Sequence, residues 1–168
     1  WPRPEVGALD PELSEQDLPA HLPYSIMTAE SALKPWVTSP AGARGLMQLM
    51  PKLAAGLHQD RFPGSPYDPD QLYQPAYNAM LGVTELGQLQ AHFGTDGRIR
   101  DEGMSHARLP LAIAGYNGGK AAVERWLSAE ASPIEADVFM ENIGYTETRR
   151  YVRRVLGYMQ TYRLVYGD

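Results

Sequence analysis

Apolar residues recur at helical spacing along much of this chain, and the longest such pattern lies near its end. Between Thr146 and Tyr166 they form one stripe along about five turns of helix, through Thr148, Val152, Val155, Met159, Tyr162 and Tyr166. A helix of this length with one apolar face predicts an element at the centre of the core.

Prolines and glycines mark the bounds of the other predicted helices. Pro23 suits the first turn of a helix because it has no amide hydrogen to donate, and Pro35 ends the same helix near Lys34. The apolar stripe of this helix consists of Leu22, Ile26, Ala29 and Leu33. Further helices are expected to begin at Pro51, to run from Pro75 to Gly94, from Pro110 to Asn117, and from Ala121 to Leu127.

The remaining segments are expected to be loops. Residues 1–20 are rich in prolines and acids, residues 59–73 form a proline- and aspartate-rich connection, and residues 95–108 should be an exposed loop. No alternating apolar and polar run stands out, so any strands should be short and lie near residues 38–49. The predicted fold class is all-α, with at most a very small β-sheet at that place.

Length and composition favour one domain. A chain of 168 residues with 43% hydrophobic residues can bury one core and is short for two. It begins at Trp1 without a methionine or a basic-then-apolar leader, so we expect a processed or excised piece of a longer protein. We assign residues 1–22 to an N-terminal extension and residues 23–168 to the functional domain.

Charge and residue usage exclude several classes of function. With 20 acidic and 15 basic residues the net charge is −5, which argues against nucleic acid as a partner. No apolar run approaches the roughly 18 residues of a transmembrane segment. The chain has no cysteine, and its four histidines lack metal-ligand spacing, so we expect no metal and no cofactor; they are His21, His58, His92 and His106.

Glu30 is the first candidate for chemistry. It lies beside the apolar stripe of the 23–34 helix, one turn from Ile26 and Met27, so its carboxylate should be half-buried. A carboxyl group donates a proton at neutral pH only where an apolar site raises its pKa. The residues that follow, with flexible glycines and an apolar run at 46–50, predict a pocket wall. From spacing alone, however, a surface ion pair with Lys34 is the more frequent outcome.

Three ordered blocks make the interpretation specific. Glu30-Ser31 is followed by Ser-Pro-Ala-Gly-Ala-Arg-Gly-Leu-Met-Gln-Leu-Met-Pro at 39–51, then by Ala-Ile-Ala-Gly-Tyr-Asn-Gly-Gly at 112–119, and by a C-terminal block within 139–152. This order resembles the soluble lytic transglycosylases, lysozyme-like enzymes that cut bacterial peptidoglycan, over residues 24–167. The departures are small: Lys34 stands where Asn is frequent, and Gly115 where Ala is usual.

The resemblance implies a lysozyme-like helical fold with Glu30 as the sole catalytic acid and base. Ser39, Gln48, Met50, Tyr116 and Glu147 would bind the saccharide. For Met50, as for Met47, core packing is an equal alternative. Asn117 is expected to cap a helix end rather than bind a ligand. The helix dipole or a neighbouring arginine explains Glu147 at least as well.

The implied reaction cleaves the β-1,4 bond between N-acetylmuramic acid and N-acetylglucosamine without water, giving 1,6-anhydromuramyl products. The expected partners are peptidoglycan glycan strands, with a possible upstream domain or cell-envelope assembly partner, and the expected location is the periplasm or cell envelope. Two alternatives remain open: a lysozyme-type hydrolase that uses Glu141 or Glu147 to activate water, and a peptidoglycan-binding or secretion-associated module.

Overall fold

The computed structural model describes residue 16 and residues 18–100, 108–130 and 133–167. It divides into two compact units, here called unit 1 (residues 1–85 and 158–168) and unit 2 (residues 86–157). The two are described separately. The predicted turn near residues 14–18 falls largely outside the described residues, as does the stretch 101–107 of the predicted exposed loop.

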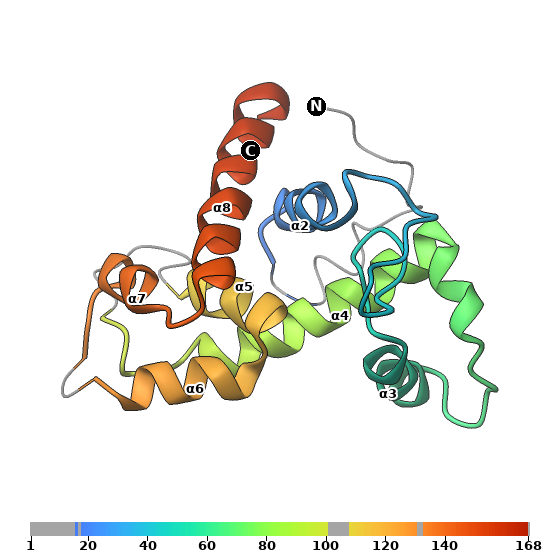
Figure 1. The fold of residues 1–168 in the computed structure, drawn as a ribbon, viewed down its shortest axis with the longest axis horizontal. Helices are drawn as coiled ribbons and strands as arrows, with labels where there is room; N and C mark the ends of the chain where they lie inside the picture. Colours follow the sequence, from blue (N-terminus) through green and yellow to red (C-terminus); the bar gives the residue numbers. More distant parts are fainter. Residues whose placement is uncertain (1–15, 17, 101–107, 131–132, 168) are drawn as a thin grey trace. The chain divides into compact units, whose positions relative to one another are not determined.

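Helices make up most of both units (Figure 1). Unit 1 contains α2 (Leu22–Ser31), α3 (Pro51–Arg61), the short 3-10 helix η1 (Pro69–Tyr73), and parts of two long helices that contribute to both units, α4 (Pro75–Phe93) and α8 (Thr146–Tyr166). Unit 2 contains the remainder of α4 and α8 together with α5 (Leu109–Gly118), α6 (Lys120–Ser128) and α7 (Ala136–Asn142).

The all-α prediction is confirmed. Among the described residues there is no β-sheet, and residues 38–49 form a loop closed by isolated antiparallel bridges from Arg44 to Thr38 and to Leu49. This segment is called the 38–49 loop below. None of the described helices is both long and apolar enough to cross a membrane.

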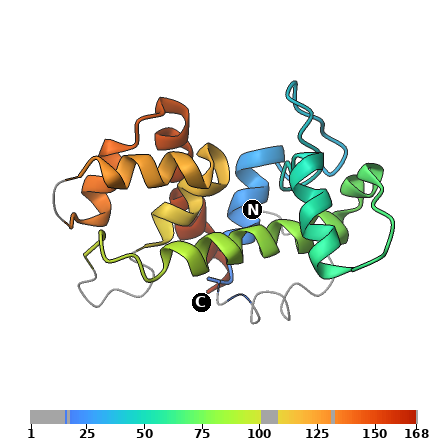
Figure 2. The same ribbon diagram turned by 90° about the horizontal axis from the view of Figure 1, so that it is seen from below.

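The two longest helices match their predicted ranges. α4 is one continuous helix that stops directly before Gly94 (Figure 2). α8 begins at Thr146 and ends at Tyr166, and its predicted stripe is buried from Thr148 to Tyr162, whereas Tyr166 is exposed. Burial of such a stripe removes apolar area from water at about 25 cal/mol per Å², which favours the helix over the open chain.

α2 is held within unit 1 by contacts with the last part of α8. The Thr28 hydroxyl lies 2.9 Å from the Tyr162 hydroxyl, and His21 Nε2 lies 2.6 Å from the carbonyl oxygen of Gly167. The apolar side of α2, including Leu22, Ile26 and Met27, is fully buried. These contacts give α2, which carries Glu30 in its last turn, a fixed place in its unit.

Three local predictions were wrong. α2 ends at Ser31 rather than near Lys34, and α3 continues to Arg61, into the predicted connection. In the predicted exposed loop, Ile99 is fully buried and forms a parallel bridge with Ile134. In addition, α7 was not predicted at all.

Candidate functional site

Glu30 lies in the last turn of α2 and is half-buried, as predicted. Ala32 and Leu33 then adopt left-handed conformations, with φ of 50° and 64°. Such conformations are unfavourable for residues with a side chain and persist only where the surrounding structure holds them. They turn the chain away from the helix, so Lys34 does not stand one helical turn beyond Glu30, and the geometry of a helical i, i+4 ion pair is absent.

Ser31 joins the end of α2 to the 38–49 loop. Its hydroxyl is buried and lies 2.8 Å from the carbonyl oxygen of Leu46 and 3.1 Å from that of Met27. A buried carbonyl without a donor costs about 1–3 kcal/mol, so this contact favours one placement of the loop relative to α2. Sequence reasoning quoted Ser31 as part of the motif but gave it no role.

Ser39 starts the tight turn of the 38–49 loop. Its N–H donates to the carbonyl oxygen of Ala43 at 2.9 Å, and its hydroxyl oxygen accepts from the N–H of Ala43 at 3.0 Å. Gly42 permits the turn with a φ of 91°. The Ser39 hydroxyl is half-exposed and keeps its own hydrogen for donation.

The side chain of Gln48 is hydrogen-bonded to the backbone of the same loop and of the residue just before it. It has a left-handed φ of 50°, and its Nε2 donates to the carbonyl oxygens of Val37 at 3.1 Å and of Gly45 at 2.9 Å. Both N–H groups of the amide are therefore used within the protein. The amide oxygen is the group that can accept a hydrogen bond from a ligand.

Asn78 fixes the 38–49 loop to α4 and was missed by sequence reasoning. Its side chain is fully buried; its Oδ1 accepts from the N–H of Met47 at 2.8 Å, and its Nδ2 donates to the carbonyls of Arg44 and Leu72, each at 2.9 Å. Its burial could have been predicted from the sequence, because Asn78 lies four residues before Gly82 and so extends the predicted apolar stripe of α4 by one turn.

The two methionines of the motif have different surroundings. Met47 is fully buried, and a Cβ atom added to Gly82 would lie 2.3 Å from Met47 Sδ, so the core-packing alternative holds for Met47. Met50 is 43% exposed and occupies the N-cap position of α3. Core packing therefore does not explain Met50.

In unit 2, Tyr116 and Asn117 lie in the last turn of α5, as predicted. Tyr116 is half-buried. The Asn117 carbonyl oxygen Oδ1 accepts a 2.7 Å hydrogen bond from the Thr148 hydroxyl, so the side chain links α5 to α8 instead of capping its own helix. At Gly115, a Cβ atom would meet Leu89 Cδ2 at 3.0 Å, which explains the glycine in this chain.

The two further carboxylates of interest are exposed. Glu147 lies in the first turn of α8, where the helix dipole favours an acid. Glu141 lies in α7 and is paired with Arg153, and its backbone carbonyl accepts a 2.9 Å bond from Arg149. The helix dipole and the pairing with Arg153 therefore account for the two carboxylates without any contact to a substrate.

The structure groups the predicted site residues by unit. Glu30, Ser39, Gln48 and Met50 belong to unit 1, where the Ser31 contact joins α2 to the 38–49 loop. Tyr116 and Glu147 belong to unit 2. Among the described residues, no three His, Asp or Glu side chains gather where they could hold a metal ion.

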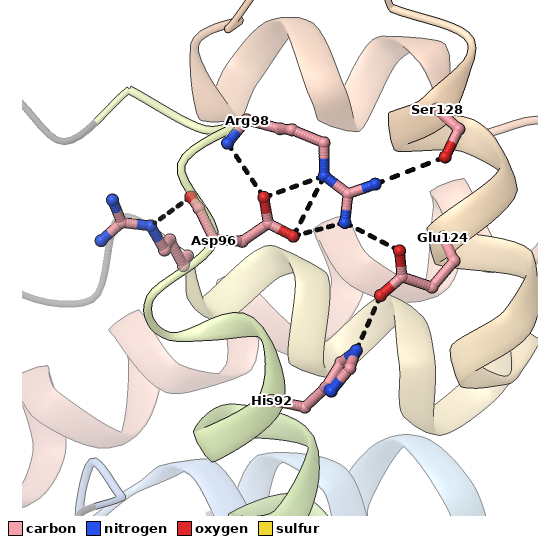
Figure 3. A network of polar contacts seen from close by, with 6 residues as sticks. His92, Asp96, Arg98, Glu124 and Ser128 are labelled. Atoms are coloured by element: carbon pink, nitrogen blue, oxygen red, sulfur yellow. Dashed lines mark hydrogen bonds and ion pairs between the residues drawn. The ribbon is translucent and has the colours of Figure 1, made fainter.

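Unit 2 also contains an ionic network that was not predicted (Figure 3). Arg98 donates to Asp96 at 2.6 Å and to Glu124 at 2.7 Å, and His92 lies 2.7 Å from the other oxygen of Glu124. Hydrogen bonds from Arg98 hold the pKa of Asp96 below its usual value, and those from Arg98 and His92 lower the pKa of Glu124. The network connects the 95–100 segment to α6.

Comparison with known proteins gives consistent matches. The family model described as "Transglycosylase SLT domain" matches residues 11–139. The chain is 36% identical to the soluble lytic murein transglycosylase of Escherichia coli (strain K12) over 156 residues, which are 92% of this chain and 22% of that protein. It is 35% identical over 145 residues to a putative soluble lytic murein transglycosylase of Haemophilus influenzae, covering 84% of this chain and 22% of that one.

Solved structures agree. The 70 kDa soluble lytic transglycosylase of Escherichia coli superposes with a TM-score of 0.81 at 33% identity, covering 97% of this chain and 25% of that chain. A complex of the 70 kDa soluble lytic transglycosylase with bulgecin A gives a TM-score of 0.81 at 34% identity, covering 95% of this chain and 24% of that chain. An inactive mutant of the lytic transglycosylase Slt from Pseudomonas aeruginosa gives a TM-score of 0.77 at 32% identity, covering 94% of this chain and 23% of that chain. The chain thus spans about a quarter of the length of these relatives.

Proposed function

The chain belongs to the transglycosylase SLT domain family, and we propose that it is a peptidoglycan lytic transglycosylase whose catalytic domain is residues 23–168. Peptidoglycan is a component of the bacterial cell envelope, so the envelope is where the proposed substrate occurs. The glycan strand is the proposed partner.

In the proposed reaction, Glu30 first protonates the oxygen of the glycosidic bond between N-acetylmuramic acid and N-acetylglucosamine. The bond from C1 of the muramyl residue to that oxygen breaks, and the muramyl acetamido group supports the developing positive charge. Glu30, now a carboxylate, takes the proton of the C6 hydroxyl while O6 bonds to C1. The products are a 1,6-anhydromuramyl end and a free hydroxyl on the leaving sugar, and no water is consumed.

The observation that carries this proposal is the position of Glu30. It lies half-buried in the last turn of α2, next to the fully buried Ile26 and Met27, and the residue after it is hydrogen-bonded to the motif loop at Leu46. A general acid needs an apolar neighbourhood and a fixed position; the buried residues one turn before Glu30 and the bond from Ser31 to Leu46 support the proposal on both points.

The other proposed substrate contacts involve polar or exposed side chains of the predicted site residues. The amide oxygen of Gln48 would accept from a sugar hydroxyl or an acetamido N–H, and the Ser39 hydroxyl would donate to an acetamido oxygen. The exposed Met50 would pack on a sugar face. From unit 2, Tyr116 would hydrogen-bond near the reacting acetamido group, and Glu147 would border the saccharide.

A lysozyme-type hydrolase would need a second carboxylate to activate water. Glu141 is a poor candidate because its carboxylate is paired with Arg153. Glu147 is exposed in the first turn of α8, where the helix dipole accounts for an acid.

Mass spectrometry of the soluble muropeptides released from purified peptidoglycan tests the proposal. Products lighter than the hydrolytic muropeptides by one water are expected. Hydrated reducing ends would indicate a hydrolase instead, and binding to peptidoglycan without any released product would indicate a binding module.

A further inference from the structure

Trp36 is an exposed tryptophan in the segment that connects α2 to the 38–49 loop. Its side chain is 71% exposed. Trp126, in contrast, is half-buried in unit 2 and packs edge-on against Tyr145 with ring centroids 5.1 Å apart. Tryptophan combines a large, rigid apolar face with one polar N–H, which suits it to binding surfaces.

Hydrogen bonds hold the two residues that follow Trp36, Val37 and Thr38, in place. The carbonyl oxygen of Val37 accepts from the N–H of Gly45 at 3.0 Å and from Gln48 Nε2 at 3.1 Å. The Thr38 hydroxyl lies 2.7 Å from the hydroxyl of Tyr73 in η1. An aromatic side chain on such a braced segment loses little backbone freedom when a ligand covers it.

We propose that Trp36 is a stacking platform for an acetamido sugar ring of the glycan strand. This inference rests on the proposed function. A pyranose has a face of C–H bonds that matches the apolar face of an indole, and the indole N–H can donate to a hydroxyl or acetamido oxygen. The Gln48 amide donates to the carbonyl oxygen of Val37, the residue after Trp36, so the proposed platform is directly linked to a proposed saccharide contact.

A neutral ring is the better match than the anionic stem peptide. Arg44, a cation of the 38–49 loop, is paired with Asp70 at 2.7 Å and lies over the ring of Tyr73, 5.5 Å from its centroid. The whole chain is also acidic, with a net charge of −5. Lys34 is the exposed cation that a stem-peptide carboxylate could reach, so it provides the contrasting variant.

The test is a titration of the 168-residue chain with a hexasaccharide of N-acetylglucosamine, which contains acetamido sugars and no peptide, followed by calorimetry. Trp36→Ala is expected to weaken binding about tenfold, and Trp36→Phe, which keeps an aromatic face, by no more than about threefold. Leu164→Ala is the matched control, because Leu164 is another apolar side chain of unit 1 that is 88% exposed. Its binding should equal that of the unaltered chain.

With peptidoglycan as substrate, Trp36→Ala should raise KM by a similar factor and change kcat by less than about twofold, because a stacking contact that does not touch the reacting atoms binds ground state and transition state alike. Hexasaccharide binding that is absent or unchanged by Trp36→Ala would overturn the inference. Loss of affinity for peptidoglycan alone, shared with Lys34→Ala, would mean a stem-peptide contact and would also overturn it.

The measurements distinguish a wrong assignment of Trp36 from a wrong proposed function. If binding depends on Trp36 but no anhydro product is released, the sugar platform stands and the lytic reaction is wrong. If anhydro products form at an unchanged KM in Trp36→Ala, the reaction stands and the platform is wrong.

Discussion

The hydroxyl oxygen of Ser31 lies 2.8 Å from the carbonyl oxygen of Leu46, so the residue after Glu30 is hydrogen-bonded to the loop that carries Gln48. The next residues, Ala32 and Leu33, are both left-handed. Helix α2 therefore ends one residue after the proposed acid, and the buried hydrogen bond of Ser31 holds this end of the helix against the 38–49 loop. The position of Glu30 relative to the 38–49 loop depends on this contact.

Ser31→Ala should lower the free energy of unfolding by about 1–2 kcal/mol, because the Leu46 carbonyl loses its side-chain donor. Turnover of peptidoglycan should fall about tenfold, since a small displacement of a catalytic group is costly. Urea denaturation and release of soluble muropeptides measure the two effects.

Ser25→Ala is the matched control in the same helix. The Ser25 hydroxyl is also buried and donates to the carbonyl of His21 at 2.7 Å, but that carbonyl keeps the N–H of Ser25 as a donor at 3.1 Å. This variant should lose less than about 1 kcal/mol and retain its turnover. Equal loss of turnover in both variants would contradict a positioning role for Ser31.

Two glycines should respond in opposite directions to the same change. Gly45 has a φ of 78°, and a Cβ atom there would lie 2.1 Å from the Leu72 carbonyl oxygen and 2.3 Å from Asn78 Nδ2. Gly45→Ala should therefore destabilise the protein by about 3 kcal/mol and displace the 38–49 loop. Thermal and urea unfolding measure the change.

Gly56→Ala provides the comparison. Gly56 lies inside α3 on the exposed side, with nothing within 4 Å of an added Cβ atom. Alanine there should stabilise the protein by about 0.5–1 kcal/mol, because glycine costs more backbone entropy in a helix. A neutral Gly45→Ala variant would mean that the loop does not need the close approach of Leu72 and Asn78.

Arg98→Ala should destabilise the protein in a pH-dependent manner. Hydrogen bonds from Arg98 hold the pKa of Asp96, whose side chain is 10% exposed, and that of Glu124 below their usual values. A carboxylate with a lowered folded-state pKa contributes stability above its unfolded pKa of about 4, and this is lost as the pH falls through the folded-state value. Because Arg98 and Glu124 are partly exposed, the expected loss at pH 7 is only about 1–2 kcal/mol.

The difference between Arg98→Ala and the unaltered chain should shrink as the pH falls below about 4, as urea unfolding at each pH would show. Arg100→Ala is the control, because its ion pair with Glu135, at 3.2 Å, is more exposed; it should cost less than about 0.5 kcal/mol at any pH. A difference for Arg98→Ala that stays constant down to pH 2 would contradict the electrostatic explanation.

Periodic burial explains which helices could be predicted from the sequence. α8 and α4 have long apolar stripes with clear ends, and both were predicted within one residue of their bounds. α7 has only seven residues and buries only Phe139, so it offers too few positions for a helical period to emerge.

The end of α2 shows a different limit. Pro35 indicated that the helix stops before it, but the left-handed Ala32 and Leu33 have no local sequence preference for that conformation. Tertiary contacts, such as the bond from Ser31 to Leu46, decide the stop. Single-residue predictions made from local pattern cannot include such contacts.

The pattern of apolar residues, prolines and glycines predicted the half-buried Glu30 and the place of Tyr116 at the end of α5. It did not predict the groups that support the site. Asn78 was not considered because a polar residue in a helix is usually at the surface, whereas here three backbone groups, two in the 38–49 loop and one in η1, satisfy its amide. Likewise, Asn117 was expected to cap α5, but its partner, Thr148, comes from a helix distant in sequence.

The role of Glu30 is tested most directly by comparing Glu30→Gln with the unaltered chain on purified peptidoglycan, with products identified by mass and folding checked by circular dichroism. Glu141→Gln is the control, because it removes a second carboxylate that is exposed and paired with Arg153. We predict that the unaltered chain and Glu141→Gln release anhydromuropeptides, and that folded Glu30→Gln does so at least about a thousandfold more slowly. Anhydro products released by Glu30→Gln at an undiminished rate would contradict the assignment of Glu30 as the catalytic acid and base.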